Sequence, residues 1–182
     1  VILVACLAVM VATVAAGCSK EAEEESEEIQ LSFIAEEYVL TGQGEPFVEE
    51  ARMLDLPGED RYLVVLDALR EAAEGMETVL REEYRIQSVQ VSVTAKSATV
   101  DFASEGLSGG SMEEELLIAQ IVRTLLLNFQ SISSVQFTVD GAVTDTLMGH
   151  LAIDQPFMLT SETDDSGNIQ YNVEAIVCTD FT

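Results

Sequence analysis

The sequence predicts an α+β two-layer sandwich, in which two helices cover one face of a mainly antiparallel sheet. Two segments, 59–75 and 111–129, have apolar residues at helical spacing. Apolar and polar residues alternate over 89–102 and 134–140, which is the pattern of half-buried strands. Because 182 residues suffice for one core but hardly for two, we expect a single folded unit.

The first two strands are expected between residues 29 and 56. Residues 29–34 alternate like a half-buried strand, and residues 50–56 form a second candidate. Glycine and proline residues within 42–46 mark a turn between the two strands. Pro57 and Gly58 then end the second strand.

Both expected helices are amphipathic. Residues 59–75 place their apolar side chains on one face and their charges on the other. Ser111 and Glu114 have the spacing of a capping box, in which each side chain would satisfy a free backbone N–H group at the start of the second helix. The expected buried stripe of that helix is Leu117, Ile118, Ile121, Val122, Leu125 and Phe129.

The remaining strands surround the second helix in the sequence. Residues 89–94 and 98–102 are expected to form a hairpin, and residues 134–140 a strand that ends at the turn of Asp140 and Gly141. After a turn at 164–168, apolar residues alternate again over 169–177. This C-terminal extension, 161–182, is therefore expected to add one strand.

The N-terminal segment has the properties of a secretory leader. Residues 1–17 carry no charge and end in small residues directly before Cys18. A spanning helix needs about 20 apolar residues, which is more than this run provides. Because Met and a basic region are missing, the sequence is expected to begin inside its signal peptide.

The junction at residues 14–18 resembles the bacterial lipobox, with Gly17 before the cleavage site and Cys18 after it. The resemblance implies diacylglycerol on the Cys18 thiol, and two acyl chains such as palmitate give stable anchoring. The protein is thus expected on the extracytoplasmic face of the cell membrane. An uncleaved anchor helix is the alternative, and it also places the domain outside the membrane.

Residues 18–28 are expected to form an acidic tether. Six glutamates and no large apolar residue fall between residues 20 and 28, so this segment cannot bury surface and repels itself. The folded domain is expected over 29–160.

The composition is strongly acidic. Asp and Glu number 33 against 8 Lys and Arg, a formal charge of −25, so phosphate backbones would be repelled and nucleic acid is excluded as a partner. The acidity is interpreted first as a property that favours solubility, as in salt-rich habitats. Once Cys6 is removed and Cys18 is lipidated, Cys178 has no disulfide partner, so we expect it to be a small buried side chain.

Candidate catalytic and metal-binding residues are few. His150 is the single histidine and lies beside Gly149 at a turn, where it is expected to cap backbone groups. The segment 164–168 superficially resembles a calcium loop, but a loop that starts at Glu162 has Val173 at its twelfth position, where a bidentate glutamate is required. The sequence contains no tryptophan to floor a sugar cleft, which disfavours a peptidoglycan hydrolase. No enzyme activity, cofactor or metal is expected.

The chain resembles the GerMN domain of the sporulation and spore-germination lipoproteins from about residue 29 to 159. The segments that carry the resemblance are 98–102, 120–125, 135–141 and 149–154. It implies a fold similar to the ring-building motif and a binding or assembly module rather than an enzyme. Within these segments, Arg123 is expected to snorkel from its helix and Gly141 to supply a positive φ.

Two function classes remain open. In the first, the domain binds an envelope protein through a sheet edge or through the sheet face that its helices leave bare, with 133–139 and 169–177 as the contact segments. Charge repulsion disfavours a homo-oligomer. In the second, the lipoprotein captures a small solute for a transporter, although such proteins usually have two lobes around a cleft.

Overall fold

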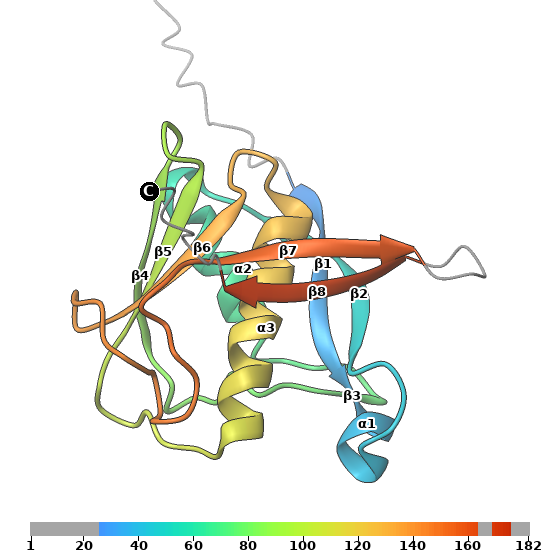
Figure 1. Ribbon diagram of the computed structural model, residues 1–182. Helices are drawn as coiled ribbons and strands as arrows, with labels where there is room; N and C mark the ends of the chain where they lie inside the picture. Colours follow the sequence, from blue (N-terminus) through green and yellow to red (C-terminus); the bar gives the residue numbers. More distant parts are fainter. Residues whose placement is uncertain (1–25, 164–168, 176–182) are drawn as a thin grey trace, which may run out of the picture.

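The computed structural model describes residues 26–163 and 169–175 (Figure 1). Several expected features lie outside the described residues: the signal peptide 1–17 with Gly17, the lipid site Cys18, the first part of the tether, the turn at 164–168, and Cys178. Among the helices that are described, none combines the length and the apolar composition needed to cross a membrane.

Helices and strands are interspersed along the chain. They are β1 (Ser26–Ala35), α1 (Glu36–Thr41), β2 (Phe47–Asp55), the 3-10 turn η1 (Gly58–Asp60), α2 (Arg61–Ala68), β3 (Met76–Glu77), β4 (Ile86–Ser92), β5 (Ser97–Phe102), α3 (Ser111–Asn128), β6 (Ser134–Val139), β7 (Phe157–Thr163) and β8 (Ile169–Ala175). The predicted α+β class is confirmed.

The strands form two sheets rather than one. The smaller sheet has the order β2-β1-β3, and the larger has the order β4-β5-β6-β7-β8. Most pairs are antiparallel, as predicted, but β5 and β6 are parallel, with Ser97 opposite Ser134 and Phe102 opposite Val139. A parallel pair needs a long crossover between its strands, and α3 provides that connection.

The N-terminal sheet begins earlier than expected. β1 starts at Ser26, so residues 26–28, which were assigned to the tether, pair with β2, and Ser26 lies opposite Asp55. The second strand also starts earlier, at Phe47 rather than at residue 50. The helix α1 between the two strands was not predicted; none of its six residues is buried, so it leaves no apolar periodicity in the sequence.

The helix expected at 59–75 is shorter in the structure, so its predicted extent was wrong. It ends at Ala68, and the chain then turns toward β3. Arg52 of β2 donates hydrogen bonds of 3.0 Å to the carbonyl oxygen of Ala68, the last helical residue, and to that of Glu71 in the turn that follows. The first of these bonds satisfies a carbonyl that has no partner within the helix.

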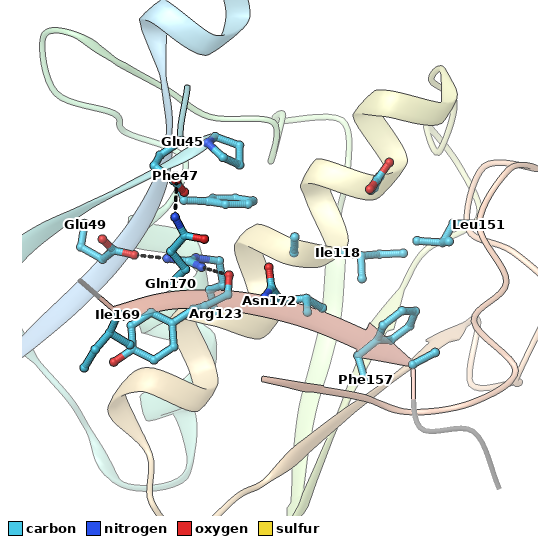
Figure 2. A pocket seen from close by; sticks show the side chains of 16 residues that line it. Glu45, Phe47, Glu49, Ile118, Arg123, Leu151, Phe157, Ile169, Gln170 and Asn172 are labelled. Atoms are coloured by element: carbon cyan, nitrogen blue, oxygen red, sulfur yellow. Dashed lines mark hydrogen bonds and ion pairs between the residues drawn. The ribbon is translucent and has the colours of Figure 1, made fainter. Parts of the chain in front are cut away.

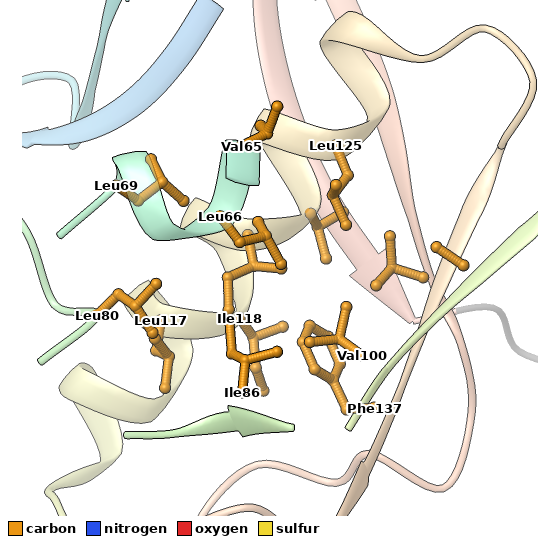
Figure 3. Close-up of a cluster of buried hydrophobic side chains, with 14 of the residues drawn as sticks. Val65, Leu66, Leu69, Leu80, Ile86, Val100, Leu117, Ile118, Leu125 and Phe137 are labelled. Carbon is orange, nitrogen blue, oxygen red and sulfur yellow. The ribbon is translucent and has the colours of Figure 1, made fainter. Parts of the chain in front are cut away.

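The helix α3 lies at the centre of the molecule. All six residues of its expected apolar stripe are buried, as predicted. Most of its other side is buried too, since Ala119, Gln120, Arg123 and Thr124 are each at most 9% exposed. Figure 3 shows side chains of α2, α3, β5 and β6 meeting in the core, among them Leu66, Ile118 and Phe137.

The β7–β8 hairpin leaves the larger sheet and crosses α3 (Figure 1). Only Val135 and Phe157 pair β6 with β7, whereas β7 and β8 pair along their whole length, from Phe157 opposite Ala175 to Thr163 opposite Ile169. The strand predicted over 169–177 is confirmed at Ile169–Ala175, but β7 was not predicted. The hairpin thereby brings β8 close to β2 of the other sheet.

Candidate partner-binding groove

A groove lies between the β7–β8 hairpin, α3 and the start of β2 (Figure 2). Its volume is about 700 Å³. It is lined by Glu45, Pro46, Phe47 and Glu49 at β2, by Glu115, Ile118, Ala119 and Arg123 of α3, by Leu151 and Phe157, and by Ile169, Gln170, Tyr171, Asn172, Val173 and Ala175 of β8. Nearly every residue of β8 lines it, so the groove follows the edge of this strand rather than one face.

Arg123 holds the two sheets together at one end of the groove. Its side chain is only 7% exposed, and its guanidinium forms an ion pair with Glu49 of β2. The same guanidinium donates a 2.8 Å hydrogen bond to the Tyr171 carbonyl oxygen of β8. Its Cζ atom lies 4.7 Å from the centre of the Phe47 ring and 5.6 Å from that of the Tyr171 ring, within the range of cation–π attraction.

A second link joins the same two strands. The side-chain amide of Gln170 donates a 3.0 Å hydrogen bond to Glu45. Figure 2 shows both links at one end of the groove, while Ile118, Leu151 and Phe157 lie at the other. The groove therefore has a polar end, closed by contacts between β2 and β8, and an apolar end that these contacts leave open.

The groove carries excess negative charge. Three carboxylates line it, from Glu45, Glu49 and Glu115, against the single guanidinium of Arg123. Glu49 already pairs with Arg123, whereas the exposed Glu115 forms no ion pair with any residue that the structure describes. A cationic group of a ligand would therefore be attracted to Glu115 and Glu45.

A smaller hollow lies beside the groove, toward α1. Its volume is about 310 Å³, and it shares Pro46, Phe47, Glu115 and Ala119 with the larger groove. Tyr38, Ser111, Met112 and Leu116 complete its wall. The two hollows are thus neighbours that share a wall, and both lie against the N-terminal half of α3.

The position of Arg123 corrects the sequence-based expectation. The side chain does not snorkel to solvent, because both sheets and the hairpin cover this part of α3. Gly141 does have the expected positive φ, at +77°, two residues after the end of β6. Its neighbour Asp140 also has a positive φ, of +49°, and hydrogen bonds from Ser104 hold the pKa of the Asp140 carboxyl below its usual value, with smaller contributions from Gln87 and Arg85.

The predicted capping box at the start of α3 was also wrong. Gly110 is the N-cap residue, and no side chain caps the helix. Glu114 instead points into the protein and is fully buried. Its carboxylate accepts hydrogen bonds from the backbone N–H groups of Leu147 and Met148, both 2.9 Å, and of His150, 2.8 Å.

His150 and the expected calcium-like loop do not meet in a site. The imidazole Nε2 atom of His150 is exposed at a turn and lies 3.2 Å from the Gly109 carbonyl oxygen. Glu162 is an exposed residue at the far end of β7, Val173 lies in β8, and residues 164–168 of that loop are outside the described residues. Within the described part of the chain, no three His, Cys, Asp or Glu side chains cluster as metal ligands would.

Most groove residues escaped the sequence analysis because they come from three distant segments, 45–49, 115–123 and 151–175. One signal was available. Arg123 lies in the mostly apolar stretch 116–127, in which Gln120 and Thr124 are the other polar residues, and a helix that is apolar nearly all round is covered on all sides. A charged residue in such a helix requires a buried partner from another element.

Comparison with known proteins agrees with this architecture. Residues 36–145, more than half of the chain, match the Germane family, described as sporulation and spore germination. No curated protein gives a match. The matched span covers most of the resemblance expected over 29–159 and ends before the segment 149–154.

Two solved structures from Bacillus subtilis are similar in fold. The tandem GerMN domains of the sporulation protein GerM align at 13% identity and a TM-score of 0.54, over 82% of this chain and 60% of that chain. The first GerMN domain of GerM aligns at 19% identity and a TM-score of 0.53, over 70% of this chain and 92% of that chain. The chain therefore belongs to the Germane family of sporulation and spore-germination proteins and has the GerMN fold.

Proposed function

We propose that this chain is a lipoprotein of the cell membrane, anchored through Cys18 on the extracytoplasmic face, whose GerMN domain is a non-catalytic binding or assembly module in sporulation or germination. The apolar leader that ends at Gly17 supports the anchor. The family match supports the biological process. The partner is another envelope protein.

One observation carries the binding role: the groove beside β8. β8 is the last strand of its sheet, and a cavity of about 700 Å³ runs along it. Edge strands that are left accessible are sites at which other chains add. Large apolar side chains also remain exposed on this strand, with Ile169 at 58% and Tyr171 at 36%.

The non-catalytic part of the proposal rests on how acidic side chains are used. Glu114 binds three backbone N–H groups, and Asp101 accepts hydrogen bonds from the Thr138 hydroxyl, 2.6 Å, and the Gly141 N–H, 2.8 Å. Asp140 accepts from Gln87 at 2.8 Å. These carboxylates satisfy backbone and side-chain donors in turns, which is a structural use.

Fractionation of cells tests the anchor. In cells that express the full precursor, the wild-type protein should appear in the membrane fraction and incorporate labelled fatty acid. The Cys18→Ala variant should lose both properties, and Cys6→Ala is the matched control that should keep them. Lipid label on mature-sized Cys18→Ala protein in the membrane fraction would refute the anchor.

Crosslinking in intact cells tests the binding role. Photoreactive residues placed at 169 and 173 should capture another envelope protein, whereas one placed at residue 22 of the tether should not. Reporters along 133–139 examine the second expected contact segment, although β6 is an inner strand and most of its residues are buried. If all reporters behave like the tether control, the binding role fails.

A second candidate function is favoured by the volume of the groove. Cavities of roughly 300–1,000 Å³ hold small molecules, so a solute-capturing lipoprotein that serves a transporter remains the alternative. Native mass spectrometry of the detergent-solubilised protein distinguishes the two functions. A co-purifying small molecule that is released by the bulky substitution Ala119→Phe would support solute capture.

A further inference from the structure

We infer that the groove binds an extended peptide segment of the partner, which adds as a strand to the free edge of β8 and carries basic and aliphatic side chains. This inference rests on the proposed binding function and specifies the chemistry of the ligand. Three features carry it: the direction of the β8 backbone groups, the spacing along α3, and the charge of the rim.

The backbone of β8 has one set of hydrogen-bonding groups directed away from β7. Thr160 of β7 lies opposite Asn172 and contacts the Asn172 carbonyl oxygen through its hydroxyl, at 3.3 Å. The neighbouring Tyr171 carbonyl instead accepts from Arg123 of α3. Since successive residues of a strand direct their N–H and C=O groups to opposite sides, Ile169, Tyr171 and Val173 direct theirs into the groove.

Arg123 forms a hydrogen bond with one of the backbone groups that β8 directs into the groove. It donates to the Tyr171 carbonyl oxygen at the polar end. The N–H and C=O of Val173 lie toward the apolar end, near Phe157, which is opposite Ala175 in the hairpin. An added strand would therefore pair with the part of β8 around Val173, where no contact from β2 crosses the groove.

The spacing along α3 fits one added strand. β8 crosses α3 at Arg123, and Ala119 and Glu115 lie one and two turns toward the start of the helix on the same face. Neighbouring strands lie about 4.8 Å apart, and one helical turn advances about 5.4 Å. A strand beside β8 would thus cross α3 over Ala119, whose small side chain leaves room for a backbone.

The side chains of such a strand would meet two kinds of wall. Those facing α3 would contact Ile118, Leu151 and Phe157, which suits aliphatic groups. Those at the rim would lie near Glu115 and Glu45, which suits lysine or arginine. The formal charge of −25 for the whole chain strengthens the preference for a basic segment.

Peptide binding to the full lipidated chain in detergent tests the inference. The probe is a fluorescent, acetyl-capped peptide Lys-Val-Lys-Val-Lys, measured by fluorescence polarisation, with Glu-Val-Glu-Val-Glu as the charge control. The basic peptide should bind and the acidic one should not. Glu115→Gln should weaken binding about fivefold, while Glu82→Gln, an exposed acid outside the groove, should leave it unchanged.

Methylation of the peptide backbone tests strand addition without any change to the protein. In an added strand, the N–H groups of alternate residues face β8 and the others face away. One of two probes, methylated either on the valine amides or on the lysine amides, should lose at least about tenfold in affinity while the other keeps it. Equal binding or equal loss for the two probes would overturn the inference, as would binding of the acidic peptide.

The two proposals fail separately. If crosslinking in cells captures an envelope protein but no basic peptide binds, the peptide inference is wrong and the binding role stands. If the peptide binds in the predicted manner but no reporter captures a protein in cells, the binding role is wrong and the peptide chemistry stands.

Discussion

Glu114 is a buried carboxylate that is satisfied entirely by backbone dipoles. No cation forms an ion pair with it among the described residues, and its two oxygens receive three N–H groups from the loop 147–150. Clustered N–H groups of this kind bind anions well. The carboxylate thus organises the loop that contains His150 and fixes it to the start of α3.

Removing that charge should destabilise the domain. Glu114→Gln keeps one oxygen but turns an NH₂ group toward a backbone donor, so at least one buried N–H loses its acceptor. The free energy of unfolding should fall by about 2–3 kcal/mol in urea titrations. The neighbouring Glu115→Gln, at an exposed position, should change it by less than about 0.5 kcal/mol. Equal effects of the two substitutions would contradict this account of Glu114.

Because of Tyr84, the free energy of unfolding should decrease as the pH rises through the alkaline range. Its hydroxyl lies 2.7 Å from the Ser108 carbonyl oxygen and 2.8 Å from Glu113, and donates its one proton to either acceptor. Burial, followed by the hydrogen bond and negative charge of Glu113, raises the pKa of Tyr84 to about 12. The hydroxyl ionises near pH 10 in the unfolded chain, so its contribution to stability is complete below that pH and is lost as the pH rises through about 12.

This pH dependence is measurable by comparison with Tyr84→Phe. Between pH 9 and pH 11, the wild-type free energy of unfolding should fall by about 1 kcal/mol more than that of the variant. Other groups that titrate in this range are common to both proteins and cancel in the difference. If the free energy of unfolding changes equally with pH in the two proteins, the fold does not raise the pKa of Tyr84.

At the scale of elements, the few polar side chains of α3 form hydrogen bonds with the backbone of β1 and of the segment after β3. Gln120 accepts a 3.2 Å hydrogen bond from the Val79 N–H, just after β3. Thr124 accepts one of 3.1 Å from the Ser32 N–H in β1, and Asn128 bonds both the N–H and the C=O of Gln30 at 2.8 Å. Beyond its short pairing with β3, the open edge of β1 is thereby closed by a helix instead of a strand.

Substitution of Thr124 tests this closure. Thr124→Val preserves the shape of the side chain but leaves the buried N–H of Ser32 without an acceptor. The domain should lose about 1–3 kcal/mol of stability, and the amide of Ser32 should exchange with deuterium faster. Thr94→Val, at an exposed turn, serves as the control. Unchanged exchange at Ser32 would mean that this bond does not protect the edge.

The predictable elements were those with local patterns. β1, the β4–β5 hairpin, α3, β6 and β8 were predicted because apolar periodicity and turn residues mark them within a short window. The separation into two sheets and the parallel pairing of β5 with β6 depend on long-range contacts that leave no local pattern. β7 was missed because only Phe157 among its residues is buried, which gives no alternation.

The groove was less predictable than the elements around it. Its walls meet only after the hairpin folds back over α3, and the ion pair between Glu49 and Arg123 joins residues 74 positions apart. The alternation over 169–177 did indicate a possible contact segment, because an added terminal strand has a free edge. No local pattern places α3 and β2 beside that edge.

At the scale of the whole molecule, most of the described basic side chains pair with acidic side chains of the same chain. Of the described basic residues, five arginines form ion pairs: Arg52, Arg61, Arg70, Arg81 and Arg123. Four of these also lie over an aromatic ring: Arg52, Arg61, Arg81 and Arg123. Most of the acidic residues that the structure describes are not in these ion pairs, and their mutual repulsion opposes the compact state.

Salt should consequently stabilise the fold and weaken binding in the groove. At 1 M ionic strength the screening length falls to about 3 Å, which removes most of the repulsion between exposed carboxylates. The free energy of unfolding should rise by on the order of 1 kcal/mol between 0.05 and 1 M NaCl, or about 3 °C in Tm. The same screening suppresses the attraction of a basic peptide to Glu45 and Glu115, so its Kd should increase over that range. Unfolding and fluorescence polarisation measured on one salt series test both directions. If Kd decreases as salt is added, apolar contacts alone hold the peptide, and the charge of the rim has no role in its selection.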